Sequence, residues 1–123
     1  MAHPLPPIIF YGPPGLEAQV FQSFLTKSGY RVRLVTVAEQ AWLALNANPT
    51  AILVIALDHS LQEARDLVQR VGTTLARRVL HIFILAEEQP FEVDLPNAEI
   101  IPRPWRLSEV IARIRALTRP KHG

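Results

Sequence analysis

Short apolar runs alternate with amphipathic stretches along the whole chain. The runs that predict strands are 8–11, 30–37, 51–57, 79–86 and 99–102. Between them, apolar residues recur every three or four positions, which predicts helices over about 15–28, over 38–45, from about 61 and from about 108. The runs 51–57 and 79–86 are apolar almost throughout, which is typical of central strands of a parallel sheet, buried on both faces.

Each helix is expected to turn one apolar stripe towards the sheet. The expected inward residues are Leu16, Val20, Phe21, Phe24 and Leu25 in the first helix, Ala38, Ala41, Trp42 and Leu45 in the second, Leu67, Val68, Val71 and Leu75 in the third, and Val110, Ile111, Ile114 and Leu117 in the last. Gly29 is expected to end the first helix, Gly72 to weaken or kink the third, and Ser108 to cap the last.

The order of these elements predicts an α/β fold in three layers. Strands that alternate with helices form a parallel sheet covered by helices on both faces. Right-handed connections leave few topologies, and the five-stranded, flavodoxin-like order 2-1-3-4-5 is the expected one. The polar segment 87–98 contains two prolines and is predicted to be a loop or a single helical turn.

The composition indicates one domain. A chain of 123 residues is enough for one core, which we place at 1–120 with a tail at 121–123. Cysteine is absent, so disulfides and thiol chemistry are excluded. No hydrophobic signal or membrane-length run is present, so a cytoplasmic protein is expected.

The small net charge of +2 hides an asymmetry along the chain. From Arg103 onward there are six Lys and Arg residues and one acid, whereas the first 102 residues carry seven bases and ten acids. The end is therefore +5 and the remainder −3. A positive helix of this kind can meet acidic protein, nucleic acid or phosphate, or it can simply present a solvated face.

The stretch "YGPPG" at 11–15 resembles the start of an ATPase phosphate-binding loop. Such a loop continues to a second Gly, a Lys that neutralises phosphate and a hydroxyl that binds Mg²⁺. Counted from Gly12, these three positions are Glu17, Ala18 and Gln19. A carboxylate replaces the glycine, and both the cation and the metal ligand are missing, so a nucleotide-binding enzyme is not expected.

The end of the chain, "IIPRPWRLSEVIARIRALTRP", resembles a known family. It is similar to the end of bacterial response-regulator receiver domains, above all those fused to winged-helix DNA-binding domains, where a strand is followed by K-P-F and then by a helix that reads E-L-x-A-R-I-R-A-L. Here "RPW" at 103–105 stands at K-P-F, and 109–117 stand at the helix. The spacing from "IIFYG" through "SGYRV" to "AILVIA" extends the resemblance over nearly the whole chain.

The resemblance implies where a phosphorylation site would lie. In receivers, an acidic pair after the first strand binds Mg²⁺, an Asp ending the third strand accepts the phosphoryl group, a Ser or Thr ending the fourth and a Lys after the fifth bind its oxygens, and an aromatic residue in the fifth strand changes rotamer. These positions fall on Gly12 and Pro13, on Ala56, on Ala86, on Arg103 and on Ile100. Without carboxylates, a metal or a nucleophile, phosphoryl transfer loses its chemistry. The chain is therefore expected to be a degenerate receiver that is not phosphorylated, needs no cofactor and binds no metal.

The resemblance also implies an interaction surface. In the resembled class, the fourth helix, fifth strand and fifth helix form a dimer face held by acid–arginine pairs, and Arg113 and Arg119 match its arginines. The segment 87–102 is shorter than in the family, so the fourth helix is expected to be shortened or missing. Trp105, Arg103 and Arg115 complete the candidate interaction residues, with edge packing as the alternative for Trp105. The family also implies a cis bond between Arg103 and Pro104.

Asp58 and the histidines are the remaining candidates for chemistry. Asp58 lies two positions beyond Ala56, so strand parity makes it a displaced phosphoacceptor or, more simply, a loop acid. The histidines do not have metal-binding spacing, and His81 lies in an apolar strand as a core or edge residue.

These observations favour a signalling module that is not an enzyme. It is expected to act by binding another protein or itself, with a homodimer as one form, and with no membrane partner. The alternative is nucleic-acid binding through the basic last helix, for which no helix-turn-helix or winged helix is visible. A further possibility is that "RALTRPKHG" begins a linker to an effector domain.

Overall fold

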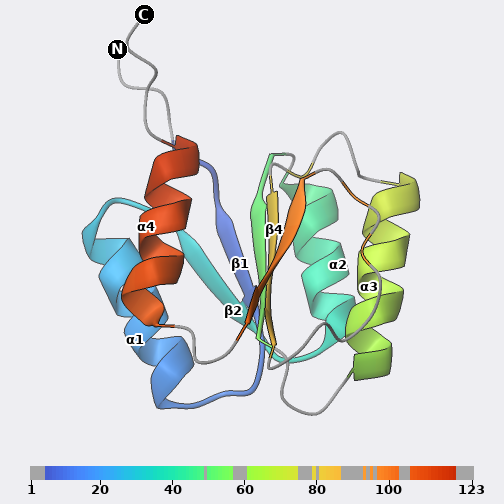
Figure 1. Cartoon of the computed structure of the whole chain (residues 1–123), viewed down its shortest axis with the longest axis horizontal. Helices are drawn as coiled ribbons and strands as arrows, with labels where there is room; N and C mark the ends of the chain where they lie inside the picture. The colour runs from blue at the N-terminus through green and yellow to red at the C-terminus, as the bar shows by residue number, and fades with distance from the viewer. Residues whose placement is uncertain are drawn as a thin grey trace, which may run out of the picture.

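The computed structural model describes residues 5–48, 50–56, 61–74, 79, 81–86, 93, 95, 97–102 and 106–118. Its centre is a five-stranded parallel sheet in the order β2-β1-β3-β4-β5 (Figure 1). The strands are β1 (Ile8–Tyr11), β2 (Val32–Val35), β3 (Ile52–Ala56), β4 (His81–Ala86) and β5 (Ala98–Pro102). The predicted order and all five predicted strands are confirmed.

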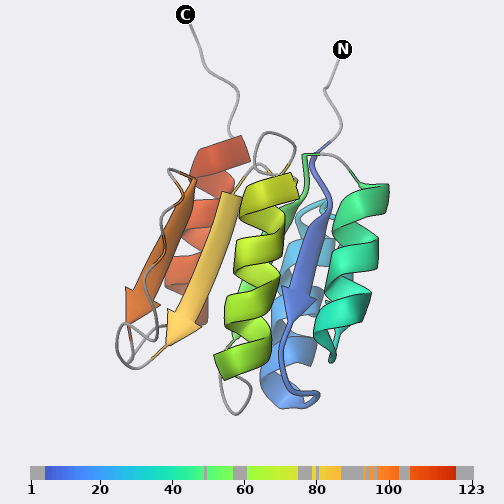
Figure 2. The ribbon, with the colours of Figure 1, turned by 90° about the vertical axis from the view of Figure 1, so that its right-hand side faces the viewer.

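Helices cover both faces of the sheet. The described residues contain α1 (Leu16–Lys27), α2 (Ala38–Ala47), α3 (Leu61–Thr74) and α4 (Leu107–Thr118). Figures 1 and 2 show α1 and α4 on one face and α2 and α3 on the other. These four helices fit a flavodoxin-like receiver fold in which the helix between β4 and β5 is shortened or missing. The label α4 thus denotes the helix that corresponds to the fifth helix of the resembled family.

Alternating side chains of the strands divide the core into two clusters. Ile8 and Phe10 of β1 pack with the buried residues of α1 and α4, whereas Ile9 and Tyr11 pack with those of α2 and α3. All the residues of β3 are buried, because this central strand is covered on both faces. The continuous apolar run at 51–57 therefore predicted its position correctly.

Several predicted inward residues face solvent instead. The exposed fractions of Leu16, Phe24 and Leu117 are 76%, 56% and 40%. The stripe of α1 that contacts the sheet consists of Ala18, Phe21 and Leu25. Because successive helical residues turn by about 100°, Phe24 lies on the flank of that stripe rather than within it.

Two predicted helix signals act differently from expectation. Ser108 is the second residue of α4, not its cap, and the carbonyl of Arg106 accepts hydrogen bonds from the amides of Glu109 and Val110. Gly72 does not interrupt α3: a Cβ at this position would lie 2.9 Å from Cδ2 of Leu95, so the glycine makes room for Leu95. Gly29 does follow the end of α1, with a φ of +96° that favours glycine.

No helix among the described residues is both long and apolar enough to cross a membrane.

Candidate functional site

The carboxyl ends of β1 and β3 meet at the centre of the sheet. In an open parallel sheet this edge, where the strand order reverses, is where ligands bind. Gly12 follows β1 and Ala56 ends β3, and the resemblance places the metal pair and the phosphoacceptor at these positions. The structure brings them together: a Cβ at Gly12 would lie only 2.9 Å from the Cβ of Ala56 and 3.1 Å from Cε1 of Phe10. The space that a side chain would need is therefore filled by apolar atoms.

Phe10 is fixed in this position by its neighbours. It is 1% exposed, and its ring centroid lies 4.8 Å from that of Phe21 in α1. The amide of Gly12 donates a hydrogen bond of 3.1 Å to the carbonyl of Val35, so its backbone is fixed to β2. The absence of a side chain at Gly12 is thus a packing requirement of the folded chain.

The loop that follows is not a phosphate cradle. Pro13 is exposed, and Gly15 adopts a φ of +154° immediately before α1 begins. Glu17 lies in the first turn of α1, and Ala18 is buried against the sheet. The helix therefore starts with a carboxylate where a phosphate-binding loop has its second glycine, and with a buried methyl group where the loop has its lysine.

The remaining predicted positions are divided between the two faces of the sheet. Ala86, which ends β4, and the half-buried Ile100 of β5 belong to the cluster under α2 and α3, whereas Ala56 belongs to the cluster under α1 and α4. None of these described positions supplies a side-chain oxygen for Mg²⁺. Within the described part of the chain, no group of three or more His, Asp or Glu residues is placed to hold a metal ion. Other predicted residues lie outside the described residues: Asp58, Arg103, Pro104, Trp105 and Arg119.

One polar contact beside this edge was not predicted. The hydroxyl of Tyr11, at the end of β1, donates a hydrogen bond of 3.2 Å to Oε2 of Glu63 in α3. Burial, and secondarily the charge and hydrogen bond of Glu63, raise the pKa of Tyr11 to about 12. The two residues are 52 positions apart, so no local sequence pattern indicates the pair.

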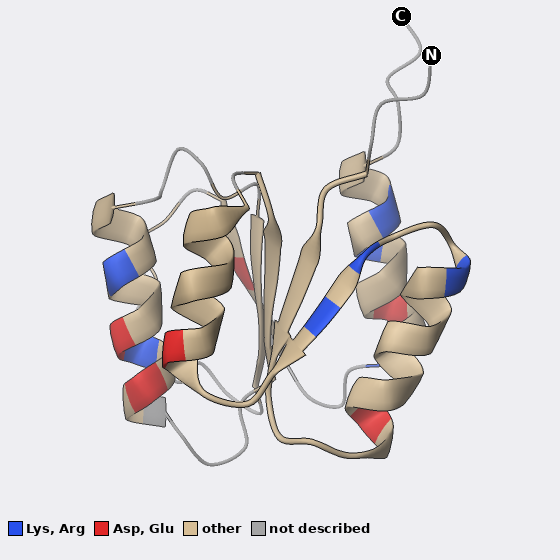
Figure 3. Ribbon diagram, turned by 180° about the vertical axis from the view of Figure 1, so that it is seen from behind, with Lys and Arg blue, Asp and Glu red and all other residues tan. Residues whose placement is uncertain are grey.

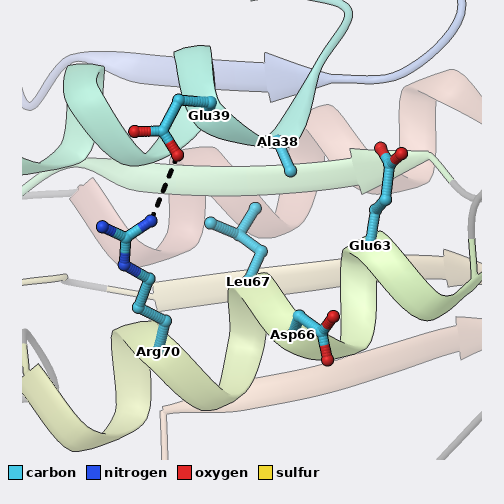
Figure 4. Close-up of a pocket in the computed structure, with 6 residues that line it drawn as sticks. All are labelled: Ala38, Glu39, Glu63, Asp66, Leu67 and Arg70. Atoms are coloured by element: carbon cyan, nitrogen blue, oxygen red, sulfur yellow. Dashed lines mark hydrogen bonds and ion pairs between the residues drawn. The ribbon is translucent and has the colours of Figure 1, made fainter.

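A cleft of about 210 Å³ lies between α2 and α3 near the same edge (Figure 4). It is lined by Ala38, Glu39, Glu63, Asp66, Leu67 and Arg70. Arg70 contacts Oε2 of Glu39 at 3.2 Å, and its guanidinium carbon lies 4.0 Å from the ring centroid of Trp42. Asp66 accepts a hydrogen bond of 2.9 Å from Gln62. Three of the lining residues are acidic and one is basic. That basic residue, Arg70 of α3, is positioned by its contacts with Glu39 and Trp42 of α2.

The structure separates the two described interaction candidates. Nη1 of Arg113 contacts Oε2 of Glu99 in β5 at 2.8 Å, and Nη2 lies 3.5 Å from Oε1 of Glu109. Nη2 of Arg115 donates instead to Oγ of Ser28, after α1, at 2.7 Å. Arg113 and Arg115 therefore lie on opposite flanks of α4.

His81 extends the Arg113 network. Its Nε2 lies 3.4 Å from Oε1 of Glu99, and its ring centroid lies 4.5 Å from that of Phe83. Burial lowers the pKa of His81 below its ordinary value, and the opposing effect of Glu99 does not cancel this shift. His81 lies in the sheet as its apolar surroundings predicted, but its buried Nε2 has no hydrogen-bond partner among the described residues.

Comparisons with solved structures identify the fold. No family profile matches the chain, and no curated protein matches it in sequence. The signal receiver domain of an HD domain-containing protein from Pseudomonas fluorescens Pf-5 superposes with a TM-score of 0.75 at 15% identity, over 96% of this chain and 90% of that one. The pseudo-receiver domain of CikA gives 0.67 at 19% identity, over 94% and 99%. The Vibrio cholerae chemotaxis response regulator CheY4 gives 0.72 at 12% identity, over 92% and 98%. The chain therefore has the fold of response-regulator receiver domains.

Proposed function

We propose that this chain is a phosphorylation-independent, receiver-like signalling module that acts by binding another protein or itself. Its setting is bacterial signal transduction or transcription regulation in the cytoplasm, because the structural neighbours are receivers of response regulators and kinases. One of those neighbours is itself a pseudo-receiver. The chain is not an enzyme in this proposal and uses no cofactor.

One observation carries the proposal, which is the contact between Gly12 and Ala56. The distance of 2.9 Å from a Cβ at Gly12 to the Cβ of Ala56 leaves no room for a carboxylate at Gly12. Ala56 has no atom that accepts a phosphoryl group, and Ala86 has no hydroxyl to bind its oxygens. A receiver built in this way holds one conformation and signals by being bound, not by being modified.

A treatment with acetyl phosphate and Mg²⁺ tests the proposal directly. Mass spectrometry is expected to find no added phosphoryl group, and sedimentation velocity is expected to show the same assembly before and after treatment. A receiver that retains its acidic pair and phosphoacceptor serves as the positive control. A phosphorylated Asp58, or a change in assembly on treatment, would refute the proposal.

Self-association is one form of this function, with Arg113 and Arg119 as the contact residues suggested by the resemblance. Arg113→Glu with Arg119→Glu is then expected to weaken any dimer, and unchanged sedimentation of this double variant would exclude that face. Arg103 and Trp105 remain interaction candidates on the same grounds.

Nucleic-acid binding is the alternative, favoured by the charge of +5 from Arg103 onward. It predicts that affinity falls steeply with salt, because phosphate contacts release counterions. If the partner is instead a protein bound through few charges, its affinity is expected to fall only slightly as the salt concentration rises.

A further inference from the structure

The cleft between α2 and α3 already holds one cationic side chain at one of its ends. The guanidinium carbon of Arg70 lies 4.0 Å from the ring centroid of Trp42, and Nη1 of Arg70 contacts Oε2 of Glu39 at 3.2 Å. Trp42 is only 9% exposed, so its ring forms a buried wall behind the guanidinium. This end of the cleft therefore binds a cation by combining an apolar surface with a carboxylate.

The other end of the cleft has the same kinds of groups without a cation. Figure 4 shows Ala38 and Leu67 between Glu63 and Arg70, with Asp66 beside Leu67. At a rise of 1.5 Å per residue, Arg70 lies roughly 10 Å from Glu63 along α3. Within the described part of the chain, neither Glu63 nor Asp66 forms an ion pair. The negative charge at this end is therefore not neutralised by the cation at the other.

Tyr11 fixes the position of the Glu63 carboxylate. Tyr11 is 5% exposed, and its hydroxyl donates a hydrogen bond of 3.2 Å to Oε2 of Glu63. This bond leaves Oε1 of Glu63 for a second donor. A side chain that is already held in place loses less conformational entropy when a partner binds to it. Glu63 is thus an exposed carboxylate that is pre-organised for a contact.

Helix termini account for only part of this arrangement. Glu39 and Glu63 lie in the first turns of α2 and α3, where the helix dipole favours a negative charge. Asp66 lies beyond the first turn of α3, so this effect does not explain it. The dipole also does not explain the apolar floor that Ala38 and Leu67 form between the charged groups.

The size and charge of the cleft indicate what it accepts. Its volume of about 210 Å³ is smaller than the roughly 300–1,000 Å³ of small-molecule sites, so it fits one side chain better than a free ligand. Its three acids and one base repel phosphate and other anions. A long side chain with a charged end suits it, because the stem packs on apolar atoms while the head stays at the rim.

We propose that this cleft binds a lysine or arginine side chain from a basic segment of a partner protein. The stem of that side chain packs on Ala38 and Leu67, and its charged head lies at Glu63 and Asp66. This inference rests on the proposed function and names the chemistry of its partner.

A second copy of the chain fits the cleft less well than a separate partner does. Figure 3 shows acidic positions on α2 and α3 in one layer and basic positions on α4 in the other. A copy that placed its α4 in the cleft of a neighbour would leave its own cleft open, so this head-to-tail contact does not close as a dimer. A symmetric contact between two clefts would bring acids together.

Three peptides of equal length test this proposal with the full chain. Each alternates serine with one other amino acid, which is lysine, norleucine or diaminobutyric acid. Norleucine keeps the stem without the charge, and diaminobutyric acid keeps the charge on a shorter stem. The lysine peptide is expected to bind most tightly, because only its side chain both covers the apolar floor and reaches the acids.

The place of binding is measured from the amide signals of the isotope-labelled chain in NMR spectra. The lysine peptide is expected to shift signals at the start of α2 and in the first half of α3, and to leave those of α4 unchanged.

Matched variants separate the cleft from general charge effects. Glu63→Gln keeps an acceptor for the hydroxyl of Tyr11 and is expected to weaken binding of the lysine peptide by about fivefold, roughly the upper value for an exposed ion pair. Glu109→Gln removes the same charge from the first turn of α4, in the other layer, and is expected to leave binding unchanged. Thermal unfolding of each variant confirms that it is folded.

Other outcomes would overturn the proposal. Equal binding of the lysine and diaminobutyric acid peptides would mean that charge alone attracts them. Equal effects of the two variants, signal shifts outside the cleft, or no binding would remove the site. Self-association of the natural chain that Glu63→Gln abolishes would assign the cleft to a second copy. None of these results bears on phosphorylation, so the acetyl phosphate experiment remains a separate test of the proposed function.

Discussion

The two ends of the sheet differ in the chemistry of their side chains. At the carboxyl edge, the described positions Gly12, Pro13, Ala56 and Ala86 carry no charge, and apolar contacts fill the space between β1 and β3. At the opposite end of the sheet, the exposed residues Lys27, Arg31, Arg33 and Arg115 carry charge, on α1, at the start of the edge strand β2 and on α4.

This difference shows that the fold can be present without the charged side chains of the ligand site that usually accompanies it. An open parallel sheet offers a ligand crevice at its carboxyl edge whatever its sequence, because the strand order reverses there. Whether that crevice does chemistry depends on the side chains placed in it. In this chain the space between Gly12 and Ala56 is packed as core.

The largest effect is expected from placing a carboxylate back at the carboxyl edge. Gly12→Asp forces a side chain against Ala56 and Phe10 and buries a charge with no described partner, so it is expected to destabilise the chain by at least about 3 kcal/mol in chemical denaturation. Pro13→Asp adds the same charge at the exposed neighbouring position and is the control. Similar unfolding free energies for the two variants would show that the crevice is not sealed.

A smaller effect is expected at the opposite end, where His81 meets Glu99. Because the pKa of His81 is lowered in the folded chain, the unfolded chain binds more protons as pH falls below about 6.5, the ordinary value for histidine. The stabilisation is complete above that pH and is lost as pH falls towards the folded pKa, with a slope of at most about 1.4 kcal/mol per pH unit.

Denaturation between pH 8 and pH 5 measures this effect as the difference between the natural chain and His81→Gln. The other groups near His81 are Phe83 and, through Glu99, the network of Arg113 and Glu109. A difference that does not change with pH would mean that Glu99 fully compensates the burial of His81.

Loss of the Tyr11 hydroxyl tests the polar contact beside the sealed edge. Tyr11→Phe removes the hydrogen bond to Glu63 and is expected to cost about 1 kcal/mol, since Glu63 is exposed and water can replace its partner. The pKa of about 12 for Tyr11 also predicts that stability present below pH 10 is lost as pH rises through 12.

Phenolate absorbance measures that ionisation. The chain has two tyrosines, so Tyr30→Phe leaves Tyr11 as the single reporter. Titration near the ordinary value of about 10 would show that Tyr11 is neither buried nor bonded to Glu63.

The smallest effect is expected from Arg113→Gln. This change breaks the contact with Glu99, but both side chains are substantially exposed, so the cost is expected to be less than about 1 kcal/mol and to shrink further at high salt. Arg106→Gln, at an exposed residue for which no ion pair is recorded in the described structure, is the comparison. If Arg113→Gln lowers the free energy of unfolding much more than Arg106→Gln does, and salt does not change this difference, the contact of Arg113 with Glu99 stabilises the packing of α4 on β5 more than an ordinary exposed ion pair would.

The sequence predicted the fold well because its strands are encoded locally. The apolar runs at 51–57 and 79–86 can be satisfied only by central strands covered on both faces, and alternation with helical periodicity then favours one strand order. The sequence also shows directly that positions 12 and 56 carry no carboxylate, because Gly12 and Ala56 are identified by residue type alone.

The outward positions of Leu16 and Phe24 were not predictable in the same way. Helical periodicity indicates that α1 has an apolar stripe, but more than one set of apolar residues in α1 fits that periodicity. The packing of Phe21 and Leu25 against the sheet decides which set is buried.

By itself, the sequence determined the five strands, their parallel arrangement and the absence of carboxylates at Gly12, Pro13 and Ala56, because these follow from local patterns and residue types. The tertiary structure alone decided that Gly12 is closed by Ala56 and Phe10, that Tyr11 meets Glu63, and that Arg113 and Arg115 face opposite flanks of α4. The physical reason is that contacts between distant residues depend on how each helix is rotated and placed on the sheet, which is set by the packing of the whole core and not by any short stretch of the chain.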